Sequence, residues 1–242
     1  MHYVFPWEKT IQDYSREYSK IQSSGAFETK EATKIAVLGS HTLNYFSKIL
    51  AVRLFENGIT ANIWTAPYGQ IEGQGINPQS ELNQFKPEFV LIIQDLNDAL
   101  GDQVEIIDFS SKEAKVEFIG TTIAYCKRLT NSFKNNGCKI LLSNFLVPPT
   151  GVYGAMETKQ KGAKRFIQEL NHYIQDEFIQ DSNVTIIDLD AAYGNAGKVD
   201  TENEKFKFLG DVHLSFKQSI MLTQEVLGAV IAIKGKTKKC IV

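Results

Sequence analysis

Long apolar runs are missing from this sequence of 242 residues. No stretch is long enough to cross a bilayer as a helix. The first residues, MHYVFPWEKTIQDYSREY, lack a basic region followed by an apolar core, so they do not form a secretory signal peptide. We therefore expect no membrane partner and a cytoplasmic location.

Cysteine and histidine are both scarce. The three cysteines are odd in number and widely spaced, so they form neither a disulfide framework nor a metal-binding pattern. Such cysteine usage fits a reducing compartment. Any histidine-dependent chemistry must use one of four residues, or one from another chain: His2, His41, His172 and His213.

Neither sign of charge dominates. The 26 basic and 28 acidic residues give a net charge of −2 and are interleaved, without the basic stripe of a nucleic-acid-binding protein. The hydrophobic fraction of 43% and the charged fraction of 22% are ordinary for a soluble globular protein. The length suits a single α/β domain.

Nucleotide-binding and cofactor-binding signatures are also missing. The first strand-to-helix turn reads Gly-Ser-His-Thr-Leu-Asn, which is not the Gly-x-Gly-x-x-Gly of a dinucleotide site. Gly235-Lys-Thr237 has no upstream glycine and no preceding strand, as a P-loop requires. Asp211 and His213 match part of a corrinoid motif, but Phe216 occupies the place of its glycine. We predict no cofactor and no metal.

Short apolar segments alternate with helical patterns along the chain. We expect buried strands at 35–38, 59–64, 89–93, 139–142 and 184–189. We expect helices from the first turn to Gly58, at 112–135, at 160–179 and from a Ser215 N-cap to about 233. Helical spacing gives the helix at 112–135 an apolar face of Val116, Ile119, Ile123 and Cys126, and gives 160–179 a stripe of Phe166, Leu170, Ile174 and Phe178. His172 lies off that stripe and is expected to be exposed, and part of 1–33 is expected to form a helix that docks on the body. Residues 71–85 are expected to be an irregular connection with at most one helical turn, and a loop is expected from the fifth strand to about 209. The alternation predicts a parallel sheet covered on both faces.

One stretch, Lys34-Ile-Ala-Val-Leu-Gly-Ser-His-Thr42, carries the main functional signal. Ser40 follows the first strand at the edge of the sheet where α/β proteins form their sites. Three interpretations stay open. Ser40 is a nucleophile, or the turn binds an anion near a helix N-terminus, or Gly-Ser is ordinary turn chemistry.

A serine nucleophile needs a base and a group that orients the base. Asp211 and His213 are two residues apart, so in an extended segment they project to the same side. His213 would then face Ser40 if the last loop folds over the first. In the plainer alternative, Asp211 caps the following helix and His213 is solvated.

Candidate oxyanion donors are the Ser40 N–H, the Gly69 N–H and a side-chain amide from Asn97 or Asn144. Each of these residues follows a predicted strand. Glycine allows close approach to a ligand, and each residue also has a plain turn role.

These blocks resemble those of the SGNH hydrolase superfamily. More closely, the sequence resembles the SGNH-like N-terminal domain of FkbH-like proteins, which adjoins a haloacid-dehalogenase-like (HAD-like) phosphatase domain. The resemblance covers about 34–242 and is carried by KIAVLGSHT, APYGQ, SELNQFKPEFVLII, LLSNF, IIDLDAAYG and GKTKKCIV. It implies a flavodoxin-like three-layer α/β/α sandwich with a mostly parallel five-stranded sheet.

The resemblance also implies site residues. Ser40 would be the nucleophile with Asp211 and His213 as partners, and Gly69 and Asn97 would be oxyanion donors. Two departures stand out. Asp95 occupies a position where the superfamily usually has glycine, and only Val212 separates the aspartate from the histidine.

The implied function is transfer of a glyceryl or other acyl unit to or from an acyl carrier protein or a sugar, with an acyl thioester as partner. In this interpretation residues 1–33 are an extension, 34–233 form the domain and 234–242 lead to the HAD-like domain, which would hold any metal. The alternative is a non-catalytic module that docks an acyl carrier protein. A stand-alone esterase is a third possibility. A docking module would need a basic surface, for which the candidates are Lys159, Lys161, Lys164 and Arg165.

Overall fold

The centre of the computed structural model is a five-stranded sheet in which all the strands are parallel. The structure describes residues 6–67, 69–101, 111–134, 137–149, 154–159, 162–198 and 214–236. The strand order is β2-β1-β3-β4-β5. The strands are β1 (Thr33–Gly39), β2 (Ala61–Thr65), β3 (Phe89–Ile93), β4 (Lys139–Ser143) and β5 (Val184–Ile187). The five predicted strands are confirmed, with ends that differ by one or two residues.

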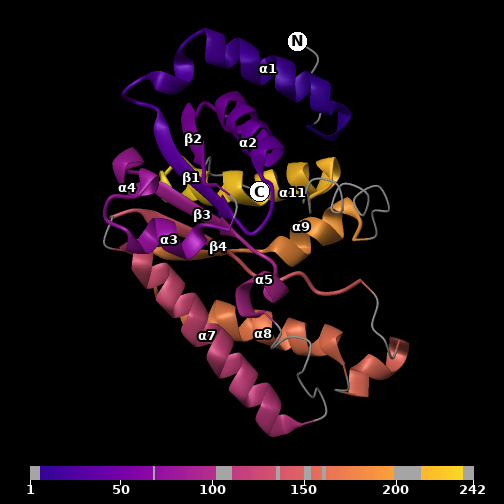
Figure 1. Cartoon of the computed structure of the whole chain (residues 1–242). Coiled ribbons are helices and arrows are strands. Elements are labelled where there is room, and N and C mark those ends of the chain that lie inside the picture. Colours follow the sequence, from indigo (N-terminus) through magenta and orange to yellow (C-terminus); the bar gives the residue numbers. More distant parts are fainter. Residues whose placement is uncertain are drawn as a thin grey trace.

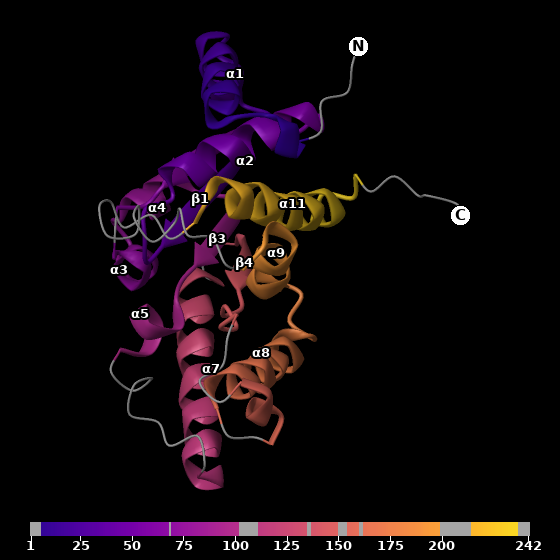
Figure 2. The same ribbon diagram turned by 90° about the vertical axis from the view of Figure 1, so that its right-hand side faces the viewer.

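Helices cover both faces of this sheet (Figures 1 and 2). One face carries α2 (Asn44–Glu56), α9 (Leu189–Ala196) and α11 (Phe216–Ile233). The other carries α7 (Lys112–Lys134) and α8 (Ala163–Phe178). The result is the predicted flavodoxin-like three-layer fold. Among the helices that the structure describes, none is both long and apolar enough to span a membrane.

Alternation along the strands explains the two cores. Val37 and Leu91 pack toward α2 and α11, whereas their neighbours Ala36 and Val90 pack toward α7 and α8. Every residue of β3 is buried. Strands covered on both faces need apolar residues at successive positions, and the sequence has them.

The predicted helices are confirmed, and the expected apolar face of α7 is confirmed in part. Cys126 is buried and Ile119 and Ile123 are half-buried, whereas Val116 is 62% exposed. Phe118 and Phe133, which were not part of the expected face, are buried. The first turns of α7 extend beyond the sheet (Figure 1). In α8 the expected stripe is buried as predicted: Phe166, Leu170, Ile174 and Phe178.

Several helices form where the sequence predicted irregular chain. Two short helices, α3 (Ile71–Ile76) and α4 (Glu81–Phe85), fill the segment after β2, and α5 (Leu96–Leu100) follows β3. The prediction of a loop directly after β5 was wrong, because α9 begins there. Its N-cap Asp188 accepts a hydrogen bond from the Ala191 N–H (3.0 Å), and its inward residues are buried.

The N-terminal segment adds an outer layer to the α2 side. Helix α1 (Ile11–Ser23) packs Tyr14 against Ile49, Val52 and Ile220. The remaining elements are short 3₁₀ turns at Pro6–Glu8, Ala26–Glu28 and Gly154–Lys159. The expectation of a helix that docks on the body is confirmed.

Candidate functional site

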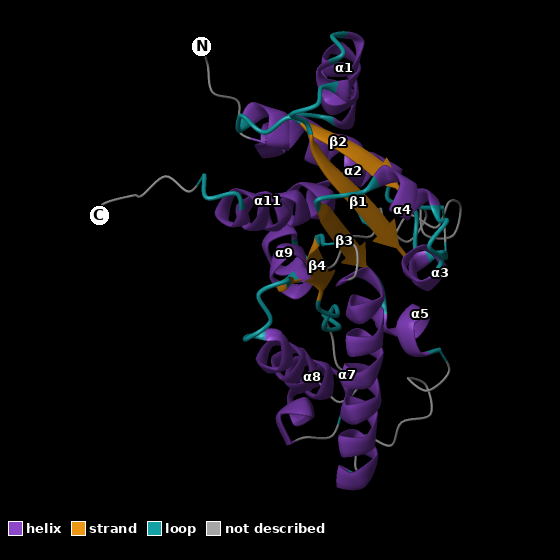
Figure 3. Cartoon of the chain, turned by 90° about the vertical axis from the view of Figure 1, so that its left-hand side faces the viewer, coloured by secondary structure: helices purple, strands orange, loops and turns teal. Residues whose placement is uncertain are grey.

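Ser40 lies at the point where the strand order reverses. Strands β1 and β3 are neighbours, and β2 lies on the outer side of β1. The connections from β1 and β3 therefore leave on different faces, which opens a crevice at their carboxyl ends. In Figure 3 the arrowheads of β1 and β3 end on the side of the sheet where α3 and α5 lie.

Two hydrogen bonds fix Ser40 against the end of β3. Its N–H donates to the Ile93 carbonyl (3.3 Å). Its Oγ accepts from the Asp95 N–H (3.2 Å). The hydroxyl still has its own proton to donate, because an acceptor bond uses only a lone pair. The Ser40 N–H is already used in this bond, which weakens its candidacy as an oxyanion donor.

Ser40 and Gly69 line the same cavity, of about 400 Å³. Gly69 lies in the loop after β2 with φ +69°, a conformation that favours glycine. The structure therefore brings together two residues that the sequence placed 29 positions apart. The other lining residues come from α3, the end of β3, α5 and α7: Ile71, Glu72, Gly73, Gln94, Asp98, Ala99 and Tyr125.

Polar and acidic groups dominate one wall of this cavity. Glu72 pairs with Arg128 (3.1 Å). The Tyr125 hydroxyl donates to Gln94 Oε1 (3.0 Å). Burial, together with the negative charge of Glu72, raises the pKa of Tyr125 to about 12, so the hydroxyl keeps its proton at neutral pH.

The two asparagine candidates do not line this cavity. Asn97 is exposed at the start of α5 and is not among the residues that line the Ser40 cavity. Asn144 Nδ2 donates to Asp188 Oδ1 (2.9 Å), and Asn144 Oδ1 accepts from the Leu189 N–H (2.8 Å). The Asn144 amide therefore joins the end of β4 to the start of α9.

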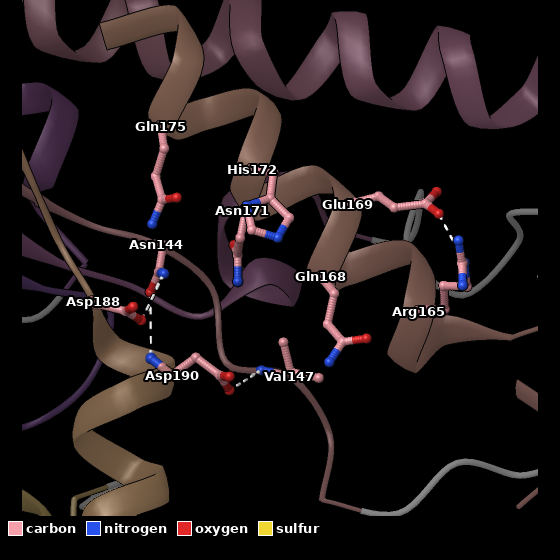
Figure 4. Close-up of a pocket in the computed structure, with 10 residues that line it drawn as sticks. All are labelled: Asn144, Val147, Arg165, Gln168, Glu169, Asn171, His172, Gln175, Asp188 and Asp190. Carbon is pink, nitrogen blue, oxygen red and sulfur yellow. Dashed lines mark hydrogen bonds and ion pairs between the residues drawn. The ribbon is translucent and has the colours of Figure 1, made fainter. Parts of the chain in front are cut away.

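A second cavity, of about 440 Å³, adjoins this junction (Figure 4). Its walls are the segment after β4, the start of α9 and the polar face of α8. Asp190 accepts from the Val147 N–H (2.9 Å) and from Lys198 (2.5 Å). His172 is exposed here, as predicted. The acidic side chains of this wall bind neighbouring chain segments, so we regard the cavity as a structural junction.

The proposed partners of Ser40 are not part of this geometry. Asp211 and His213 lie outside the described residues, as do Lys161 and the side chain of Lys159. Nearby on α8, Arg165 pairs with Glu169 (2.9 Å). Lys164 donates to the Pro149 carbonyl (3.4 Å).

Sequence reasoning missed seven of the nine lining residues, among them Gln94 and Tyr125. Gln94 directly follows a buried strand, as Ser40 does, and this position was a usable signal. Tyr125 comes from the middle of α7. No local pattern distinguishes it from the other half-buried residues of that helix.

A family model matches most of the chain. Residues 34–230 match the family model described as "FkbH, N-terminal domain". No curated protein matches the sequence.

The fold is similar to solved structures. One is the N-terminal part of BF1531 from Bacteroides fragilis, which contains a phosphatase domain (TM-score 0.76, 17% identity, 96% of this chain covered). This chain spans 59% of that structure. A lipase from a goat rumen metagenome, Lip_vut3, has TM-score 0.56 and 13% identity, over 82% of this chain and 97% of the lipase. A putative acylhydrolase of B. fragilis, BF3764, has TM-score 0.51 and 13% identity, over 96% of this chain and 99% of the acylhydrolase.

At such identities the likeness concerns the fold, and it confirms the predicted SGNH-hydrolase-like architecture. The family match covers most of the sequence and begins at the first strand, as the resemblance predicted. The chain belongs to the FkbH N-terminal domain family.

Proposed function

We propose that this chain is an SGNH-like acyl hydrolase or acyltransferase domain in which Ser40 forms an acyl-enzyme. The observation that carries the proposal is the position of Ser40 at the switch point, beside Gly69, in a cavity of about 400 Å³. Ser40 is 8% exposed, and its hydroxyl, held by the Asp95 N–H, is oriented before substrate binds.

In the proposed reaction, Ser40 Oγ attacks the carbonyl carbon of a thioester or ester. The hydroxyl proton passes to His213, which Asp211 orients, and the carbonyl electrons move onto oxygen. Collapse of this intermediate expels the thiol or alcohol, which takes the proton from His213. Water, a carrier thiol or a sugar hydroxyl then attacks the acyl-enzyme by the same steps in reverse.

Packing next to the proposed base supports this assignment. Leu214, the residue after His213, belongs to the same buried cluster as Leu43 and Ile93. Leu43 precedes α2 in the connection that holds Ser40, and Ile93 accepts the Ser40 N–H.

The substrate and setting follow from the family resemblance. We propose a glyceryl or other acyl unit, carried on an acyl carrier protein or transferred to a sugar, and a cytoplasmic reaction. We also propose that 1–33 is an extension of a domain at 34–233, and that 234–242 lead to a HAD-like domain. The BF1531 structure contains a phosphatase domain, and this chain spans 59% of it, which supports this arrangement.

The docking-module alternative needs an unopposed basic surface. On α8, Glu169 already neutralises Arg165, and Lys164 is bound to a backbone carbonyl. The described part of the basic group therefore gives this alternative little support, and we retain acyl transfer as the working function.

The test is incubation with a small acyl thioester of N-acetylcysteamine, followed by intact-protein and peptide mass spectrometry. We expect the mass of one acyl group on Ser40 in the wild type and none in Ser40→Ala. The matched control is Ser143→Ala, which removes another buried serine hydroxyl, outside the Ser40 cavity. This control should acylate like the wild type. An unmodified wild type that binds a carrier protein would support the docking module instead.

A further inference from the structure

Gln94 is the residue of the Ser40 cavity whose side chain has an unexplained polar group. It directly follows β3, is 1% exposed and lines the cavity. Its Oε1 accepts from Tyr125, whereas its Nε2 is buried and has no hydrogen-bond partner in the part of the chain that the structure describes. Buried donors are rarely left unpaired, so this one calls for a physical reason.

The backbone places Gln94 beside Ser40. The Ser40 N–H binds the carbonyl of Ile93, and the Ser40 Oγ binds the N–H of Asp95. Ser40 therefore contacts the residues on both sides of Gln94. The two cavity-lining residues cannot move apart without breaking one of these bonds.

Tyr125 fixes the direction of the amide. Its hydroxyl holds Oε1 on the α7 side, so the planar amide has its N–H₂ group at the opposite end. The hydroxyl of Tyr125 stays protonated at neutral pH, since burial raises its pKa to about 12. It can therefore donate to Oε1 throughout the range in which a serine hydrolase works.

The side-chain oxyanion donors expected from the sequence are not among the residues that line the Ser40 cavity. Asn97 is exposed and outside the cavity lining, and both ends of the Asn144 amide are occupied at α9. The Ser40 N–H is bound to Ile93. An acyl-transfer site at Ser40 needs a donor where the carbonyl oxygen gains its charge.

We propose that the side-chain amide of Gln94 is an oxyanion donor for acyl transfer at Ser40, and that Tyr125 is its positioning residue. This inference rests on the proposed function. As the Ser40 Oγ–carbon bond forms and the hydroxyl proton leaves for His213, the carbonyl electron pair moves to oxygen. The Gln94 N–H then donates to that oxygen, which gives the buried Nε2 the partner that it lacks.

The test uses a fluorophosphonate, which reacts with an activated serine through a similarly charged transition state. The rate constant of Ser40 labelling is measured for the wild type, Gln94→Leu, Gln94→Glu and Tyr125→Phe. The control is Ser143→Ala, which alters a buried polar side chain outside the cavity. Circular dichroism identifies any variant that does not fold.

We expect Gln94→Leu to label about 10²–10³-fold more slowly, the loss typical of a removed oxyanion donor. Gln94→Glu keeps an acceptor for Tyr125 but has no N–H when ionised. It should be slow at pH 8 and recover, relative to the wild type at the same pH, as the carboxyl is protonated. Tyr125→Phe should lower the labelling rate at saturating probe about tenfold while the half-saturating concentration stays the same.

The outcomes separate the two proposals. A wild type that does not label at Ser40 contradicts the proposed function, and the role of Gln94 with it. A wild type that labels, together with folded Gln94 variants that label at the wild-type rate, contradicts the role of Gln94 alone. If Gln94→Leu does not fold, the other two variants decide. A loss of labelling rate in Gln94→Glu that does not change with pH contradicts the role of Gln94. An unchanged labelling rate in Tyr125→Phe contradicts it as well.

Discussion

Ser40 shows how a single residue acquires a functional position from its neighbours. Its N–H binds the carbonyl of Ile93, the last residue of β3, and its Oγ binds the N–H of Asp95, the residue before α5. The bond of the N–H uses only the backbone, whereas the bond to Oγ needs the serine hydroxyl. They follow from the parallel pairing of β1 with β3, which brings Gly39 opposite Ile93.

Asn144 illustrates the opposite case, a polar residue after a strand that serves structure. We predict that Asn144→Ala lowers the free energy of unfolding by about 1–3 kcal/mol, because the Leu189 N–H and the Asp188 carboxylate lose a buried partner. Urea unfolding measures this loss, and fluorophosphonate labelling of Ser40 should continue.

The matched control is Asn195→Ala, on the exposed side of α9. Its unfolding free energy should stay within about 0.5 kcal/mol of the wild type. A stable Asn144→Ala variant that no longer labels at Ser40 would show that Asn144 acts in catalysis after all.

At the scale of whole elements, α11 begins with a reciprocal capping box. The Ser215 Oγ accepts from the Gln218 N–H (3.2 Å), and Gln218 Oε1 accepts from the Ser215 N–H (2.8 Å). Ser215→Ala should lower the unfolding free energy by about 1 kcal/mol. Ser19→Ala, on an exposed part of α1, is the control and should change it little. Equal losses in both variants would contradict a special role for the cap.

An ion pair at the end of α7 predicts that the stability of the fold falls at acidic pH. Lys134, at the end of α7, binds Asp181 Oδ2 (2.7 Å), in the turn before β5. The hydrogen bond from Lys134, followed by that from the Asn183 N–H, lowers the pKa of Asp181 below its ordinary value of 3.8.

A carboxyl whose pKa is lower in the folded state stabilises the fold above its unfolded pKa. That contribution is constant from pH 7 to about pH 5 and disappears as the pH falls through the folded pKa. Urea midpoints of Asp181→Asn should therefore depend less on pH below about 4 than those of the wild type. Identical acid dependence would contradict the assignment.

For the whole molecule, the layered fold was predictable because its signals are local. Continuous apolar runs such as Phe89–Ile93 indicated strands buried on both faces, and the four-residue spacing of Phe166 and Leu170 indicated α8. Helix α9 was missed because its stability comes from the Asp188 cap and from buried contacts distant in sequence. The exposure of Val116 on α7 was missed because the helical spacing of a segment does not show which of its turns extend beyond the sheet.

The candidate site was predictable only in part, because some of its residues come together through contacts that are distant in sequence. Ser40 and Gly69 could be proposed from their places after strands, and the structure brings them to one cavity. Gln94 and Tyr125 enter that cavity through the pairing of β1 with β3 and through the packing of α7. Such long-range relations leave no pattern in neighbouring residues.

The most direct measurement of the central claim is fluorophosphonate labelling of the intact chain, read by peptide mass spectrometry, in the wild type and Ser40→Ala. An activated serine at the switch point predicts one labelled peptide, which contains Ser40, and no label in the variant. A wild type that stays unlabelled, where a control serine hydrolase is fully modified, would contradict acyl transfer at Ser40.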